Sequence, residues 1–82
     1  MDVPLSKEAK ALTLGKYEHF KGNRYEVIDV ARHSETLEEY VVYRKLYGDR
    51  TLWVRPLKLF LEPAEKDGKK IERFRYVGKE IE

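Results

Sequence analysis

The sequence contains no cysteine among its 82 residues. Without thiols, neither a disulfide nor a thiolate metal site can supplement the core, which fits a reducing compartment. It also lacks an apolar run long enough to span a membrane, and the charged residues near its start are unlike a signal peptide. We therefore expect a cytoplasmic domain with no membrane partner.

An excess of charge of one sign is lacking as well. Lys and Arg number 17 against 15 Asp and Glu, which gives a formal net charge of +2 at pH 7. This balance is too weak to imply a polyanionic partner by itself. A chain of this length fits one domain near the lower size limit for a self-sufficient core. It leaves little room for a deep pocket.

Tyr-, Val- and Ile-rich runs separated by polar turns predict five short strands. We expect them at 15–20, from 24 to the polar insert at 32–36, and at 39–47, 51–55 and 71–77. Residues 57–61 follow a proline and predict a helical turn that inserts Leu57, Phe60 and Leu61 into the core. Residues 62–70 are expected to form a polar loop with a turn at Asp67-Gly68.

The apolar residues of the second strand change face between Val27 and Ile28, which predicts a bulge that bends the strand. A bent five-stranded sheet favours closure, because closure removes exposed edges. The fold class we predict is all-β, a small five-stranded SH3-like barrel with a short helical turn before the last strand.

The ends of the chain read differently from its middle. Residues 1–14 form an extension in which Ser6 can cap a short helix over 7–12, docked by Leu5, Ala9 and Leu12. A frayed tail is the alternative. Residues 15–77 form the single domain, and 78–82 a loose tail.

A polar and aromatic cluster is the first candidate site. Trp53 and Arg55 share one strand face by the period of two, with Tyr43 on the strand before. Aromatic rings can stack on a planar ligand while a guanidinium grips an anionic group. The alternative is a core tryptophan with solvated or carboxylate-paired arginines. The ligand-binding residues we predict are Arg32, His33, Glu35, Tyr43, Arg44, Trp53, Arg55 and Arg73.

Catalytic and metal chemistry have weaker signals. His33-Ser34-Glu35 are neighbours in the chain, and neighbours rarely converge as a triad. His19 and His33 match no metal-ligand spacing. No catalytic residue, metal or cofactor is therefore predicted, although a small enzyme or enzyme subunit stays open as an alternative.

We expect a non-catalytic binding module that engages a polar or anionic ligand through the His33 loop and the Trp53–Arg55 face. The ligand classes are a nucleotide, a nucleic-acid segment or a peptide. Binding to single-stranded nucleic acid is the second hypothesis, since small barrels stack bases on aromatics beside basic residues. The alternative without a binding function is a structural domain in which the candidate site residues form an internal hydrogen-bond network.

Four motifs follow one another in the chain. They are His19-Phe20-Lys21-Gly22, His33-Ser34-Glu35-Thr36, Val41-Val42-Tyr43-Arg44 and Trp53-Val54-Arg55-Pro56, followed by Phe60 and Arg73-Phe74. In this order the sequence resembles the bacterial domain of unknown function family numbered sixteen fifty-three. The resemblance covers roughly residues 15–77. It implies the fold and the position of a site but no activity.

Overall fold

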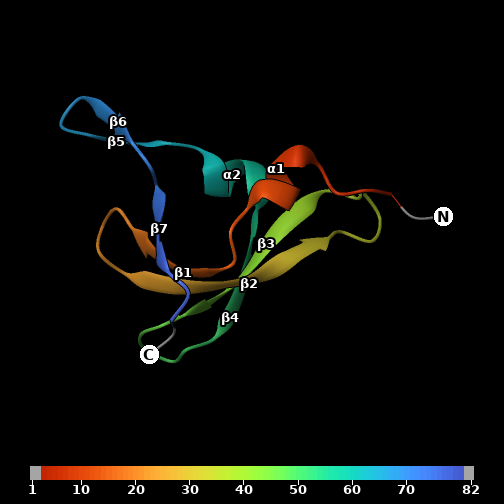
Figure 1. Ribbon diagram of the computed structural model, residues 1–82, viewed down its shortest axis with the longest axis horizontal. Coiled ribbons are helices and arrows are strands. Elements are labelled where there is room, and N and C mark those ends of the chain that lie inside the picture. Colours follow the sequence, from red (N-terminus) through yellow and green to blue (C-terminus); the bar gives the residue numbers. More distant parts are fainter. Residues whose placement is uncertain (1–2, 81–82) are drawn as a thin grey trace.

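A bent antiparallel sheet forms the body of the protein, with two short helices beside it (Figure 1). The computed structural model describes residues 3–80. The helices are α1 (Lys7–Ala11) and α2 (Leu57–Leu61), and the strands are β1 (Gly15–His19), β2 (Arg24–Arg32), β3 (Glu39–Lys45), β4 (Leu52–Pro56), β5 (Ala64–Lys66), β6 (Lys69–Ile71) and β7 (Phe74–Gly78).

The main sheet has five strands in the order β4-β3-β2-β1-β7. The protein is thus mostly β, and the predicted five-stranded antiparallel sheet is confirmed. The sheet is open, because β4 and β7 are its two edges and pair only with β3 and β1 among the described strands. Between these edges the Arg55 side chain of β4 reaches the Phe74 ring of β7. Closure into an SH3-like barrel is therefore not confirmed.

The bend in β2 lies where the sequence predicts it. Its register against β3 shifts between Val27 and Asp29, so Ile28 is the extra residue of a bulge. Val27 is buried and Ile28 is exposed, and Val30 packs against the core after the bulge. The extra residue lets apolar side chains on both sides of the bend reach one core.

The core lies between the sheet and the two helices. Val27 and Val41 are almost fully buried, and around them pack Ala9, Tyr17, Leu57, Phe60 and Phe74. The two buried residues of α2, Leu57 and Phe60, occupy its core side. Leu61 was also expected in the core, but it is 47% exposed. That expectation is wrong because the helix ends there and turns its last side chain outward.

The N-terminal helix forms and docks on the body. The Ser6 hydroxyl accepts a hydrogen bond from the Ala9 N–H, which is the expected cap. Ala9 is buried, and Leu5 and Leu12 pack against the core. The helix is therefore confirmed over the frayed tail for the residues that the structure describes, whereas Met1 and Asp2 lie outside them.

The polar segment after α2 is a hairpin rather than a loop. β5 and β6 pair antiparallel around Asp67 and Gly68, both of which have positive φ. The turn is confirmed, but the loop is wrong, and β7 begins three residues later than expected because Ile71 pairs with Ala64. The hairpin projects from the body (Figure 1). No helix among residues 3–80 is long and apolar enough to cross a membrane.

Candidate functional site

Three of the predicted ligand-binding residues meet on the core-facing side of β3 and β4. Tyr43 lies opposite Trp53 in the ladder, and Arg55 lies opposite the buried Val41. Trp53 is 51% exposed, so its indole is not a core residue. The period of two that grouped Trp53 with Arg55 in the sequence holds in the structure.

Two more tyrosines and a lysine complete this surface. The ring of Tyr25 lies 5.3 Å from that of Tyr43 and 5.6 Å from that of Tyr47, both edge-on. Lys45 Nζ lies 4.9 Å from the centre of the Tyr47 ring and 6.0 Å from that of Trp53. Together they line a shallow cavity of about 190 Å³. We call Tyr25, Tyr43, Lys45, Tyr47 and Trp53 the aromatic face.

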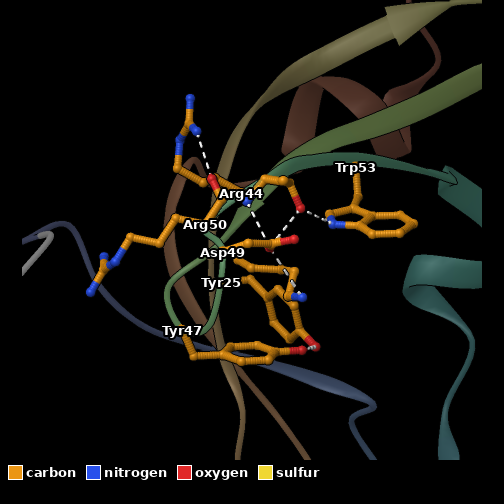
Figure 2. Close-up of polar contacts among 8 residues, drawn as sticks. Tyr25, Arg44, Tyr47, Asp49, Arg50 and Trp53 are labelled. Carbon is orange, nitrogen blue, oxygen red and sulfur yellow. Dashed lines mark hydrogen bonds and ion pairs between the residues drawn. The ribbon is translucent and has the colours of Figure 1, made fainter.

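The turn between β3 and β4 holds the indole in place (Figure 2). Trp53 Nε1 donates to Thr51 Oγ1 at 2.8 Å, and Thr51 Oγ1 donates to Asp49 Oδ1 at 2.9 Å. Asp49 also lies 3.4 Å from Lys45 Nζ. The Thr51 hydrogen bonds, and after them Lys45, lower the pKa of Asp49, so the carboxylate stays charged at neutral pH. The Trp53 indole and the Lys45 ammonium group are thus both held by contacts to the same turn.

Two tyrosine hydroxyls of the aromatic face are hydrogen-bonded to each other. Tyr25 Oη and Tyr47 Oη are 2.9 Å apart, and the contact is visible in Figure 2. Burial raises the pKa of Tyr25 to about 12, and the hydrogen bond with Tyr47 adds to the effect. The Tyr25 hydroxyl therefore stays neutral at physiological pH. It can act as a donor and as an acceptor toward a ligand.

Arg55 and Phe74 lie at the deeper end of the surface, which is the end next to the core. The Arg55 guanidinium carbon lies 5.7 Å from the centre of the Phe74 ring, which stacks at 4.3 Å on Phe60. Arg55 Nε is buried and has no hydrogen-bond partner among residues 3–80. Burial and then the nearby cations, Arg73 foremost, lower the pKa of His19, whose ring meets Phe74 edge-on. Arg55 is thus a cation held against the core with unused donor capacity.

The predicted His33 loop lies elsewhere. The loop between β2 and β3 lies beside α1, at the end of the hairpin away from the β3–β4 turn (Figure 1). His33 Nδ1 accepts from the N–H groups of Glu35 and Thr36 at 3.1 and 3.3 Å. The Ser34 hydroxyl donates to the Glu35 carboxylate at 2.5 Å. These groups mainly tighten their own loop.

The other predicted residues are also scattered. Arg32 donates from its guanidinium to the Val3 carbonyl, beside α1. Arg44 lies on the outer face of the sheet, opposite Leu52, and donates to the Arg50 carbonyl at 2.9 Å. Arg73 lies near the Phe20 ring and donates to the Glu62 carbonyl. The eight predicted residues therefore do not form one site.

Sequence reasoning missed Tyr25, Lys45 and Tyr47. A signal was available, because Tyr43, Lys45 and Tyr47 alternate and so share the face of Trp53. Among residues 3–80 no three His, Asp or Glu side chains are grouped so that they could hold a metal ion. The two histidines do not form a shared ligand set with the surrounding carboxylates.

Comparisons with known proteins agree with one another. Residues 15–76 match the family described as "Protein of unknown function (DUF1653)". A crystal structure of a protein of the same family from Bordetella bronchiseptica is 33% identical, with a TM-score of 0.79. The match covers 87% of this chain and 94% of that one. No curated protein matches the chain.

Proposed function

The chain belongs to the DUF1653 family, and we propose that it is a small binding module without catalysis of its own. Its ligand is polar or anionic and carries a planar ring, as a nucleotide does. The ligand docks on the aromatic face, with Arg55 at the deeper end. The main support for this proposal is the half-exposed Trp53 indole, which lies beside Lys45.

The chemistry of this surface fits such a ligand. A planar ring can stack on the exposed faces of Trp53 and Tyr47, where base–aromatic stacking stabilises binding by about 1–3 kcal/mol per base. An anionic group can then reach the Lys45 ammonium and lie near the positive charge of the Arg55 guanidinium. The hydrogen bonds from the Trp53 indole to Thr51 and from Thr51 to Asp49 already orient the indole. Less side-chain entropy is therefore lost when a ligand binds.

Extended ligands can reach further. A single strand of nucleic acid or a peptide could contact the aromatic face and then basic residues outside it. The predicted residues that lie outside the aromatic face and could join only in this way are Arg32, His33, Glu35, Arg44 and Arg73. Nucleic-acid binding is the second candidate function, favoured by the two exposed aromatics beside Lys45. Acidic residues such as Asp49 and Glu26 break up the basic surface and limit it.

The test uses the single tryptophan as the reporter. Fluorescence titrations with nucleoside monophosphates and short single strands, at low and moderate salt, should quench Trp53. Lys45→Gln and Arg55→Gln should each weaken binding about tenfold, whereas Lys58→Gln, at an exposed position of α2, serves as the control and should not. Equal affinity for all three variants would overturn the proposal. A steep loss of affinity with salt would favour the nucleic-acid ligand.

We further propose that the fold is a half-open relative of the SH3-like barrel. The support is the strand order, in which the bent β2 joins two halves of one sheet, and the helical turn α2 between β4 and β7. Arg55 of β4 also reaches the Phe74 ring of β7 across the interior. The two edge strands thus approach each other through side chains.

A further inference from the structure

The edge strand β4 carries a free row of backbone groups. Lys45 N–H donates to the Thr51 carbonyl, so in this antiparallel ladder the odd-numbered residues of β4 bond to β3. The N–H and C=O groups of Leu52 and Val54 must then point away from β3. Beyond them the sheet has no further strand among the described residues. This edge can pair with another strand.

The exposed stretch of β4, from Leu52 to Val54, has no charge or proline that would block such pairing. Its three exposed residues, Leu52, Trp53 and Val54, are apolar and uncharged, with Leu52 at 52% and Val54 at 58% exposed. Sheet edges are usually protected by charges, prolines or bulges. The opposite edge, β7, has such features, since it carries Arg75 and its pairing with β1 is irregular beside Lys16. Pro56 ends β4 but leaves the donors of Leu52 and Val54 free.

We propose that β4 pairs antiparallel with β4 of a second copy of this chain, about a two-fold axis at Trp53. In this register Leu52 of each copy lies opposite Val54 of the other. It pairs every outward N–H and C=O of these two residues. A register centred on Val54 places Leu52 opposite Pro56, which has no N–H to give. One centred on Leu52 places Val54 opposite Arg50, which precedes β4 and has a positive φ. The strand is therefore complementary to itself.

The side chains favour a second copy as the occupant. On the outer face, Leu52 of each copy packs against Val54 of the other, so the two-fold axis gives this contact twice. On the inner face, Arg55 lies opposite Thr51 of the second copy, beside the Asp49 carboxylate that this threonine binds. The pairing thus places Arg55 of one copy and Asp49 of the other at the same end of the contact, twice, as a two-fold contact requires. The aromatic faces of the two copies would become one continuous surface.

The size of the contact sets its expected strength. One pair of short edge strands buries less than the roughly 1,200 Å² of a stable complex. The dimer should therefore be reversible, with a Kd in the micromolar to millimolar range. This inference does not rest on the proposed function, since the backbone groups pair whatever ligand binds.

Sedimentation equilibrium up to about 1 mM protein provides the test. The wild type should show a monomer–dimer equilibrium. Val54→Pro removes an outward donor without removing a hydrogen bond to β3, and Val54→Lys places a charge at the edge. Both should weaken dimerisation at least tenfold. Leu59→Lys alters an exposed leucine of α2 and should behave as the wild type.

Cysteine cross-linking fixes the register, because the chain has no cysteine of its own. Directly opposed residues at such a position have Cα atoms about 4.5 Å apart, which a disulfide can bridge. Oxidised Trp53→Cys should form a covalent dimer, and Leu59→Cys should not. A wild type that stays monomeric would overturn the inference and leave this edge to an extended segment of another protein. Dimers insensitive to both Val54 variants, or cross-linked through Val54→Cys but not Trp53→Cys, would also overturn it.

Discussion

Large aromatic side chains have two distinct roles in this small sheet. Phe74 is buried and contacts the rings of Phe60, His19 and Tyr43, so it holds the core together. Trp53 is half-exposed and is oriented by one hydrogen bond to Thr51. The first side chain is needed for stability, whereas the second is available to a ligand.

Alanine substitution should separate the two roles. Phe74→Ala should lower the free energy of unfolding by about 3–5 kcal/mol, because it opens a cavity in the core. Trp53→Ala should cost less, about 1–2 kcal/mol, since it removes one hydrogen bond and a side chain that is already half-exposed. Urea denaturation monitored by circular dichroism measures both. A loss as large for Trp53→Ala as for Phe74→Ala would make Trp53 a structural residue.

The tyrosine pair predicts a dependence of stability on alkaline pH. Tyr25 has a pKa of about 12 in the folded protein, against an ordinary value near 10. A raised pKa means that the folded state holds this proton more tightly. The stabilisation is fully present below pH 10 and is lost as the pH rises through 12.

Spectrophotometric titration of the phenolates can follow this ionisation. Tyr47→Phe removes a hydrogen bond that raises the pKa of Tyr25, so the pKa should fall but stay above 10, because burial is the larger cause. Tyr40→Phe, in which an exposed hydroxyl bound to Glu38 is lost, is the control. An unchanged Tyr25 titration in Tyr47→Phe would contradict the role of the hydroxyl contact.

At the scale of the elements, α1 is fastened at its first turn. Ser6 caps the helix, and its N–H and hydroxyl donate to the Glu39 carboxylate at 2.8 and 2.6 Å. A helix of five residues is too short to persist alone. Its stability therefore depends on this attachment to β3 and on the burial of Ala9.

Ser6→Ala should lower the free energy of unfolding by about 1 kcal/mol and speed amide exchange at Ala9 and Lys10. Ser34→Ala, in which only a contact with the Glu35 side chain is lost, should leave both unchanged. The Ser6 hydrogen bonds lower the pKa of Glu39. Their stabilisation is thus present at neutral pH and lost as the pH falls through this lowered pKa. Unaltered exchange in Ser6→Ala would show that the cap is dispensable.

Local signals in the sequence suffice for most elements. The change of face at Val27 and Ile28 gives the bulge, Ser6 gives the start of α1, and Asp67-Gly68 gives the turn. The β5–β6 hairpin could not be predicted, because its strands are short and carry charges on both faces. A hairpin without apolar alternation looks like a loop in sequence.

The candidate site was only partly predictable for a related reason. Tyr43, Trp53 and Arg55 could be grouped because alternation places residues on one face of neighbouring strands. The separation of His33 from them follows from the length of the β2–β3 hairpin, which puts its loop and the β3–β4 turn at opposite ends. The short separation of His33 from Tyr43 in the sequence does not show how far apart the two residues lie in the folded sheet.

At the scale of the whole molecule, the sheet remains open and the β5–β6 hairpin extends from it. The radius of gyration is 13.3 Å, against about 12 Å for a compact domain of this length. The extended shape leaves both sheet edges and the aromatic face accessible. An open sheet of this kind fits the binding role that we propose.

The central claim is that the aromatic face binds the ligand, and an NMR titration tests it most directly. Nucleotides and short single strands are added to labelled protein while the amide signals and the Trp53 indole N–H are followed. The expected result is a cluster of shifts at residues 43–47 and 53–55, with the indole signal among them. Shifts confined to the loop at 33–36, or none across the panel from a folded protein, would contradict the claim.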